Sequence, residues 1–408
     1  MLRFLTAGES HGQAEIAILE GIPAGLSLTR EDIQNDLDKR KGGAGRGGRV
    51  FIEKDQVKIL SGVRHGKTLG SPIALIVENN DYANWKETMS IDPLKSIVDY
   101  STHPRGVLAS HPRKITNPRP GHADLSGLVK YGFDDIRNVI ERASARETIM
   151  RVAIGALCRK LLLEIGVEIA SHTIQIGEIK LIRVQTFEGP TLFEKVKRVY
   201  DKDPEIRCID DVVSKRMLAE IDNARRAKNT LGGVVETIAH NVPVGLGSYV
   251  QWDRKLDGRL AQALMSIHSV KAVEIGDGVV NTQLFGSQVH DEILASQGEA
   301  LQSFFRKTNR AGGLEGGVTN GEDIVCRVYH KPISTLGNPL DSVDIKTKQK
   351  TKALIERSDI CVVPRAGVIS EAMVAYVLAD AALEKFAGDS SEEFKRNYEG
   401  YKRQISNF

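Results

Sequence analysis

The sequence predicts a mixed fold of helices and strands built as one integrated domain. Short β-branched runs that end in Pro or Gly turns have the pattern of strands. Longer apolar or amphipathic stretches have the length of helices. No low-complexity linker divides the 408 residues, although length alone would suggest two or three domains. We therefore expect a single domain over residues 1–408.

In the N-terminal part, residues 14–26 (AEIAILEGIPAGL) indicate a strand followed by a Pro/Gly turn. Thr29 then begins a predicted helix, because Thr29 and Asp32 are spaced as in a capping box. Two strand-like runs follow at 56–63 and 71–79, joined by a turn. Residues 85–121 have no regular pattern, and a long irregular stretch is typical of a functional or a disordered segment.

Three long helices are predicted farther along the chain. Residues 147–166 are apolar enough to be mostly buried, whereas 210–230 are amphipathic and more exposed. Residues 368–388 form the third predicted helix, which ends at Gly388 as a C-cap would.

One internal repeat is visible, because ILEGIPAGL (18–26) resembles IAHNVPVGL (238–246) at an offset of 220 residues. Each copy follows a β-branched strand and precedes a helical segment. Chance recurrence of a Pro-x-Gly turn is one interpretation, and two similar halves of one domain is the other. The second places the halves at about 10–200 and 230–390.

Composition and charge argue against a protein that coats nucleic acid, a disulfide-rich protein and a membrane-spanning protein. Fifty-six basic and 53 acidic residues give a net charge of only +3, so positive charge is local rather than general. The four cysteines form no CxxC pair, which favours free buried thiols in a reducing compartment and no metal site. Since we find neither a signal peptide nor an apolar run near 18 residues, we expect a cytoplasmic protein without a membrane span.

The most unusual stretch is residues 39–49, KRKGGAGRGGR, with five basic residues and five glycines. Arg40, Arg46 and Arg49 can make bidentate contacts to phosphate or carboxylate, and the glycines allow close backbone approach. Two interpretations compete, a loop that holds a small anion and an RNA-binding arm. RNA binding would need aromatic platforms beside the basic residues. None lies within 39–49, so the anion loop is favoured.

Other stretches also combine glycine with ionisable side chains. His11 lies in a turn between glycines, where its imidazole could exchange protons near neutral pH. Arg119 and His122 follow a stiff Pro/Gly turn at a predicted helix start, a place that favours anions. Arg142 and Arg146 are four residues apart beside Ser144, at the start of a buried helix.

A C-terminal group of stretches completes the candidate site, at 309–321, 330–335 and 356–367. The remaining histidines show no metal-ligand spacing, and we expect most of them to be surface or core residues. Together the stretches predict an arginine-rich site for a small ligand with several negative groups. An enzyme acting on a phosphorylated or polycarboxylate metabolite is therefore favoured over the RNA-binding alternative.

In chain order the motifs are GESHG, KRKGGAGRGGR, RPGHAD, RASARET, SIHSVKAVEIGDG, NRAGGLEGGVTNG, KPIST, RSDICVVPRAG and EAM. This ordered set closely resembles the chorismate synthase family, over residues 3 to about 385. The resemblance implies an α+β fold of the β-α-β sandwich type, with helices packed between two antiparallel sheets and pseudo-duplicated halves. Family members are typically homotetramers.

The resemblance also implies an activity, the anti-1,4 elimination of phosphate from 5-enolpyruvylshikimate-3-phosphate to give chorismate. This carbon–oxygen lyase reaction is the last common step of the shikimate pathway to the aromatic amino acids. It requires reduced FMN and is redox-neutral overall. NADPH is expected as an indirect reductant. Because we see no insertion typical of bifunctional members, an external flavin reductase is the expected partner.

Roles carry over from the family motif by motif. The resemblance makes His11 the proton donor to the leaving phosphate, His122 a proton donor or support for the reduced flavin, and Asp359 a helper in hydrogen removal. It assigns substrate anions to Arg40, Arg46, Arg49, Arg119 and Arg146, and NADP to Arg40 and Arg46. Flavin contacts are assigned to Arg142, Ala143, Ser144, His268, Ser269, Gly316, Lys331, Pro332, Ile333, Ser334, Thr335 and Arg357.

The chain departs from the family pattern in two places. Many members have His and Pro around the aspartate, where this chain has Ser358 and Ile360. Many have Asn-Ala or Gln-Ala where this chain has His268 and Ser269. The segment 86–116 looks longer than in short members of the family, and the resemblance gives it no role.

Overall fold

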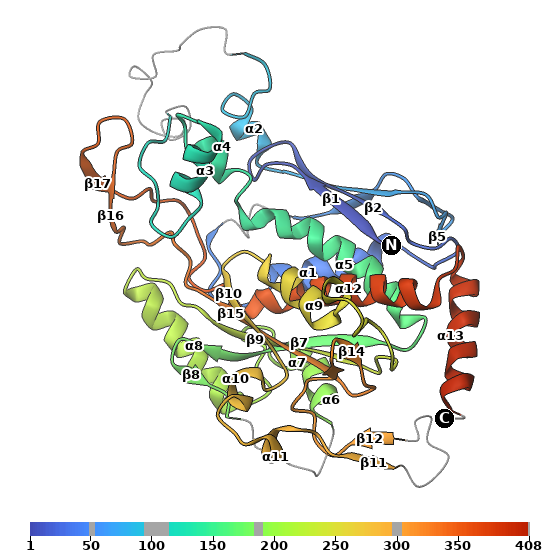
Figure 1. Ribbon diagram of the computed structural model, residues 1–408. Helices are drawn as coiled ribbons and strands as arrows, with labels where there is room; N and C mark the ends of the chain where they lie inside the picture. The colour runs from blue at the N-terminus through green and yellow to red at the C-terminus, as the bar shows by residue number, and fades with distance from the viewer. Residues whose placement is uncertain (49–53, 94–113, 183–190, 296–303, 407–408) are drawn as a thin grey trace.

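The computed structural model describes residues 1–48, 54–93, 114–182, 191–295 and 304–406. Figure 1 shows a layered molecule, in which a group of helices lies between an upper sheet and a lower sheet. The predicted α+β sandwich with antiparallel sheets is confirmed. The free, buried state predicted for the four cysteines is confirmed as well.

The upper sheet has the strand order β1-β2-β6-β3, and all its pairings are antiparallel. Its strands are β1 (Arg3–Ala7), β2 (Ala14–Glu20), β6 (Ile73–Glu78) and β3 (Val57–Ile59). Side chains alternate along β2, where Ala17 and Leu19 are buried while Ile16 and Ile18 are exposed. One face of the sheet thus covers the helices, and the other carries exposed apolar side chains.

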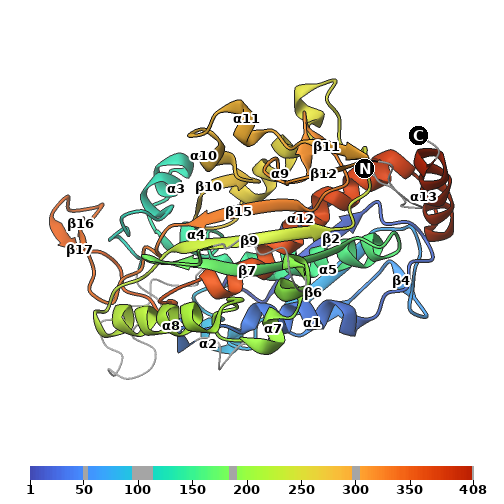
Figure 2. The same cartoon turned by 90° about the horizontal axis from the view of Figure 1, so that it is seen from below.

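The lower sheet has the order β10-β15-β9-β7-β8 and is also antiparallel. Its strands are β10 (Val270–Ile275), β15 (Ile324–His330), β9 (Gly233–His240), β7 (Glu168–Ile176) and β8 (Ile179–Lys180). β15, β9 and β7 run side by side below the helices (Figure 2). They are buried along most of their length, so both faces of the sheet are covered.

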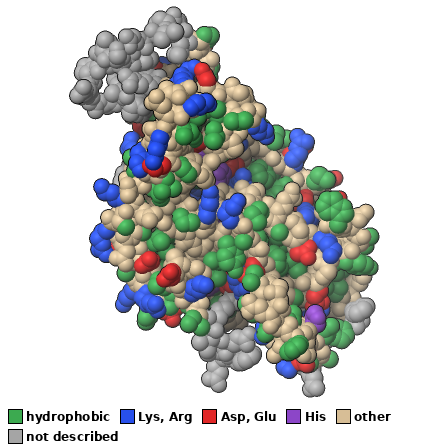
Figure 3. All heavy atoms as spheres, turned by 60° about the vertical axis from the view of Figure 1, so that its left-hand side comes forward, with side chains coloured by type: hydrophobic (Ala, Val, Ile, Leu, Met, Phe, Trp, Pro, Cys, Tyr) green, Lys and Arg blue, Asp and Glu red, His purple; other side chains and the backbone are tan. Residues whose placement is uncertain are grey.

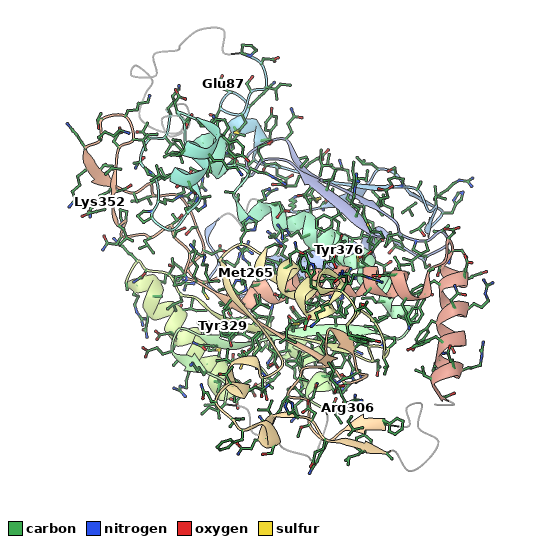
Figure 4. All side chains as sticks on the ribbon, in the orientation of Figure 1. Glu87, Met265, Arg306, Tyr329, Lys352 and Tyr376 are labelled. Atoms are coloured by element: carbon green, nitrogen blue, oxygen red, sulfur yellow. The ribbon has the colours of Figure 1, made fainter. Side chains whose placement is uncertain are left out.

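Four helices make the middle layer: α1 (Arg30–Lys41), α5 (Thr148–Leu163), α9 (Leu256–Met265) and α12 (Val363–Phe386). α12 contacts α5 and the lower strands β7 and β9, while α5 contacts β2 and β6 above. A Cβ on Gly155 of α5 would lie 2.3 Å from the Cβ of Ala372 of α12. The absence of a side chain there lets the two helices approach closely. Figure 4 labels Tyr376, a residue of α12 in this layer.

Smaller elements surround the sandwich. The short helices are α2 (Tyr82–Trp85), α3 (Asp124–Tyr131), α4 (Arg137–Ile140), η3 (Ala145–Glu147), α6 (Leu192–Lys197), α7 (Val199–Lys202), η4 (Trp252–Arg254), α10 (Gly278–Asn281) and α11 (Gly286–Val289). The longer α8 (Asp211–Arg226) and α13 (Ser391–Ser406) lie on the outside (Figure 1). The short strands form four hairpins, β4 (Val63–Arg64) with β5 (Lys67–Thr68), β11 (Ile293–Ala295) with β12 (Phe304–Arg306), β13 (Leu314–Glu315) with β14 (Val318–Thr319), and β16 (Asp341–Val343) with β17 (Lys350–Lys352).

The predicted helices exist, with shifted ends. The capping box of Thr29 and Asp32 begins α1 as predicted. α12 begins at Val363 rather than 368, because Pro364 occupies its first turn, where a missing N–H costs nothing. It ends at Phe386, before Ala387 and Gly388, which both have positive φ angles of 52° and 114°.

The repeated segments make the same hydrogen bonds in both places. Thr68 Oγ1 donates to Pro23 O (2.6 Å) and accepts from Leu26 N (2.9 Å). Thr319 Oγ1 donates to Pro243 O (2.6 Å) and accepts from Leu246 N (2.8 Å). Since one threonine from a short hairpin fixes each Pro/Gly turn, we propose that the single domain contains a pseudo-repeat, with halves at about 10–200 and 230–390.

α12 bears on the expectation that no apolar run could span a membrane. By length and composition alone, this one helix of the described residues could cross a bilayer, which corrects that expectation. However, 89% of its most apolar window is buried inside the molecule. Its apolar character is therefore explained by its place in the core.

Candidate active site

A cavity of about 440 Å³ opens where the C-terminal end of α1, the start of α12, η3 and the end of β15 meet. Its lining residues come from seven stretches of chain, at 10–11, 40–46, 119–123, 140–148, 267–269, 330–335 and 356–369. In the space-filling view, basic side chains and a histidine lie around a hollow below the grey atoms (Figure 3). Segments far apart in sequence thus build one site.

One side of the cavity carries arginines whose orientation is fixed from behind. Arg40 donates to Thr148 Oγ1 from both Nε and Nη2, at 3.1 and 3.0 Å. Buried Asp55 lies 3.6 Å from Arg40 Nη1 and 3.7 Å from Arg146 Nη2. A single carboxylate therefore holds two guanidinium groups side by side at the cavity wall.

Asp359 connects the Gly/Arg loop to α12. Its Oδ1 accepts the backbone N–H of Gly47 at 2.7 Å, and its Oδ2 forms an ion pair with Arg365 Nη2 at 2.5 Å. Arg46 Nε lies 3.8 Å from the same carboxylate. Asp359 is thus a carboxylate among cations at the cavity.

His11 is held by Glu141. Nδ1 of His11 lies 3.0 Å from both carboxylate oxygens, and the His11 backbone N–H donates to Oε2 at 2.8 Å. Arg137 donates to the same carboxylate at 3.0 Å. Burial acts to raise the pKa of Glu141, but the hydrogen bonds from His11 and Arg137 outweigh it and lower the pKa. Glu141 is therefore an anion that fixes one side of the imidazole.

A second histidine is held in a similar way by Asp124, a fully buried residue at the start of α3. His122 Nδ1 lies 2.5 Å from Asp124 Oδ1, and Arg119 Nε donates to Oδ2 at 2.8 Å. Burial acts to raise the pKa of Asp124, but the hydrogen bonds of His122 and Arg119 hold it well below its usual range. Arg119 also donates to Thr335 Oγ1 at 3.0 Å, which joins this group to the 330–335 stretch.

Another part of the wall is made of neutral imidazoles. Burial lowers the pKa of His268 to about 4 and that of His330 to about 4. Ser269 Oγ lies 2.9 Å from His330 Nδ1. Among the described residues, His268 Nδ1 and His330 Nε2 are buried and have no hydrogen-bond partner. These two imidazoles therefore offer neutral hydrogen-bonding groups in a lining that also contains Lys331 and Arg357.

Most residues predicted from the sequence line this one cavity: His11, Arg40, Arg46, Arg119, His122, Ala143, Ser144, Arg146, His268, Ser269, Lys331, Pro332, Ile333, Ser334, Thr335, Arg357 and Asp359. Arg49 lies outside the described residues. Arg40 belongs to the last turn of α1, not to the loop that follows it.

Two predicted residues are not part of the lining. Arg142 lies in an adjoining cavity that shares His268, and its guanidinium donates to Thr6 O at 3.0 Å and Gly8 O at 3.2 Å. Gly316 lies in the turn between β13 and β14, where an added Cβ would lie 3.8 Å from Tyr249 Cβ.

Sequence reasoning missed the residues that hold the site together, namely Asp55, Asp124, Glu141, His330 and Arg365. Glu141 and Asp124 stood inside quoted motifs, so the carboxylate beside each basic residue was an available signal. Asp55 carries no local pattern. His330 lies inside the candidate stretch 330–335, but no role is predicted for it, and it lines the cavity.

Comparison with known proteins gives a consistent result. A family model described as chorismate synthase matches residues 2–383. Chorismate synthase of Aquifex aeolicus is 51% identical over 414 residues, covering 100% of this chain and 99% of its own. That of Symbiobacterium thermophilum is 52% identical over 406 residues, covering 99% and 100%. A solved structure titled "Crystal Structure of Chorismate Synthase" is 42% identical, with a TM-score of 0.76 and coverage of 100% and 99%.

Proposed function

Because the chain belongs to the chorismate synthase family, we propose that it converts 5-enolpyruvylshikimate-3-phosphate to chorismate and phosphate, with reduced FMN as cofactor. The single observation that carries this proposal is one cavity lined both by several arginines and by two neutral imidazoles. The substrate has a phosphate and two carboxylates, which match the arginines. The flat ring of a flavin matches the neutral imidazoles.

The arginines would hold the substrate and stabilise the leaving phosphate. Arg40, Arg46, Arg119 and Arg146 line the cavity, and three of them are oriented by Asp55 or Asp124. Guanidinium groups fixed before the substrate arrives need no reorganisation as negative charge grows on the phosphate. Arg49 is proposed as a fifth contact by resemblance alone. Arg40 and Arg46 would also bind NADP.

Proton transfers would fall to the histidines. Glu141 occupies Nδ1 of His11, which leaves Nε2 to protonate the leaving phosphate. His122 would support the reduced flavin while Asp124 occupies its Nδ1. Asp359 would assist removal of the ring hydrogen, held in place by the backbone N–H of Gly47.

The two neutral histidines and several other lining residues fit a flavin. His268 Nδ1 and His330 Nε2 are buried polar atoms without a partner among the described residues, and a heteroaromatic ring with alternating donors and acceptors would satisfy such groups. His268, Ser269, residues 331–335, Ala143, Ser144 and Arg357 would hold it. Arg142 and Gly316 would contact the cofactor only if the ligand extends beyond this cavity or if a second subunit completes the site. When bound, reduced FMN would supply the transient electron that the elimination requires, because the ring hydrogen is not acidic enough for a base alone.

A homotetramer in the cytoplasm completes the proposal. The outer face of the upper sheet carries Leu5, Ile16 and Ile18 with exposures of 63%, 37% and 46%. Leu5 is paired with Ile18, and Ile16 is paired with Ile76 of β6, so the side chains form one apolar patch. A patch of this kind is typical of a subunit interface. An external reductase would supply the reduced flavin.

The direct test is anaerobic incubation of the protein with 5-enolpyruvylshikimate-3-phosphate and chemically reduced FMN. Chorismate absorbance and released phosphate should rise together in equal amounts. The same mixture with oxidised FMN should give neither. Absence of product with reduced FMN, from protein that binds FMN, would contradict the proposal.

A further inference from the structure

The side chain of His11 is stacked on a tryptophan that is not part of the cavity lining. The ring centroids of His11 and Trp85 lie 3.7 Å apart, with an angle of 26° between the ring planes. Trp85 is 6% exposed and occupies the end of α2. The cavity is lined by His11 but, among the described residues, not by Trp85. Among the described contacts, Trp85 therefore reaches the site through the imidazole of His11 and through Arg137, which donates to Glu141.

The tryptophan is itself fixed over the His11 turn. Its indole N–H donates to Asp81 Oδ2 at 3.0 Å, and the Arg137 guanidinium lies 5.2 Å from its ring centroid. Asn79, just before α2, donates from Nδ2 to Gly12 O and from its backbone N–H to Gln13 O, each at 2.9 Å. The segment that carries Trp85 is thus tied to the backbone on the C-terminal side of His11.

Glu141 fixes the imidazole from the other direction. Because a carboxylate can only accept, the hydrogen bond to Glu141 keeps a proton on Nδ1, so the proton that His11 donates is the one on Nε2 of the doubly protonated imidazolium. Within the described part of the chain, His11 Nε2 makes no hydrogen bond. A hydrogen bond in the ring plane still leaves rotation about that bond, and the indole face removes it.

We propose that Trp85 and Glu141 are positioning residues for His11, which together hold Nε2 in one direction toward the group that receives its proton. This inference rests on the proposed function, in which His11 is the proton donor. It assigns a role to Trp85, the first residue of the irregular stretch 85–121.

The kinetic test compares Trp85→Leu with Trp85→Phe in the anaerobic assay. Trp85→Leu should lower kcat by about tenfold and leave KM and the FMN dissociation constant within about twofold, because the indole touches neither ligand. Trp85→Phe keeps an aromatic face and should restore kcat to within about threefold of wild type. Trp252→Phe is the matched control, since Trp252 is 80% exposed and outside the cavity.

A double-mutant cycle separates positioning from general support of the fold. If Trp85 acts through His11, Trp85→Leu should change kcat by less than about twofold in a His11→Ala background. Glu141→Gln should likewise change kcat by less than about twofold in the His11→Ala background. An undiminished effect in that background, or wild-type kcat in Trp85→Leu, would overturn the proposal.

Fluorescence tests the stack without substrate or cofactor. The chain has two tryptophans, so Trp252→Phe leaves Trp85 as the only one. Its emission should change when His11 is replaced by Ala and stay the same when exposed His290 is replaced by Ala. Identical emission with and without His11 would overturn the proposal. This experiment keeps Trp85, so it remains decisive if Trp85→Leu does not fold. If wild-type protein makes no chorismate, the proposed function is contradicted. The fluorescence measurement would still show whether the His11 and Trp85 rings are stacked.

Discussion

At the residue scale, several basic groups of the cavity have a buried acid behind them. Asp55 holds Arg40 and Arg146, while Asp124 holds Arg119 and His122. Such pairs bring little stability by themselves, since burying both charges costs much of what their attraction gains. The acids fix the direction in which each basic side chain points. An arginine with a fixed direction can meet a phosphate without reorganising.

The first prediction concerns the two cavity histidines. His11→Ala and His122→Ala should each lower kcat at least about tenfold, because each removes a positioned proton donor. Thermal unfolding should stay near that of wild type. His290→Ala, on the exposed surface, is the control and should keep full activity. Near-normal turnover with pre-reduced FMN in either variant would exclude that histidine from the mechanism.

The second prediction concerns His330, whose pKa burial lowers from 6.5 to about 4. The unfolded chain binds a proton in this range that the folded protein excludes, so folding stability falls as the pH drops from about 6.5 to 4. The shift corresponds to about 3 kcal/mol. His330→Phe should therefore lose less stability than wild type between pH 7 and pH 4.5. Burial raises the pKa of Glu15 to about 7, so its contribution to folding stability increases as the pH falls. This contribution is present in both wild type and His330→Phe, so it does not affect the comparison.

Denaturant titrations of wild type and His330→Phe at the two pH values measure this difference. Parallel losses of unfolding free energy in the two proteins would show that His330 is not held neutral.

These residues also show what the sequence could and could not predict. The histidines and arginines stand in short motifs with glycine or proline, so their chemistry is readable locally. Asp55 is an isolated acid, and its partners lie 15 and 91 positions away in the chain. His268 and His330 become neutral only through burial, which depends on the whole fold.

At the element scale, the Gly/Arg stretch divides into two parts. α1 continues through Lys41, so its last turn carries Arg40, and only the following residues form a loop. That loop is docked on the segment before α12, where Ile360 N–H donates to Gly45 O at 2.7 Å and Gly47 N–H donates to Asp359. Composition predicted an anion-binding loop, but it did not show the helix end or the docking partner. The docking contacts join residues more than 300 positions apart in the chain.

The third prediction uses two neighbouring glycines of this loop. A Cβ on Gly47 would lie 2.5 Å from the carbonyl oxygen of Ser358, whereas a Cβ on Gly48 meets nothing within 4 Å. Gly47→Ala should push the loop away from Asp359 and raise KM for the substrate by about fivefold or more. Gly48→Ala is the matched control, expected within about twofold of wild type. Equal KM values in the two variants would contradict the docking of this loop in solution.

At the scale of the whole molecule, the sandwich brings seven stretches of chain to one cavity. The apolar helices and the strand pairs were visible in the sequence because their periodicity is local. The order of strands in each sheet was not, because pairings such as β2 with β6 join distant segments. The repeated Pro/Gly turns were the one long-range signal, and each is closed by an equivalent threonine.

The fourth prediction concerns assembly through the outer face of the upper sheet. Ile18→Lys places a charge in the middle of the apolar patch of Leu5, Ile16 and Ile18, so it should disfavour association. Light scattering should give a smaller species for this variant than for wild type. Val212→Lys, at an exposed site on α8, is the control. An unchanged mass for Ile18→Lys would show that this face is not the interface.

The central claim is that the cavity carries out a redox-neutral elimination that needs flavin only in its reduced form. The most direct measurement counts chorismate formed per reduced FMN under strict anaerobiosis, with the flavin spectrum recorded throughout. We predict many chorismate molecules per flavin, with the flavin still reduced when the substrate is exhausted. Product that stops at one per flavin, or flavin that is oxidised in step with product, would contradict the account.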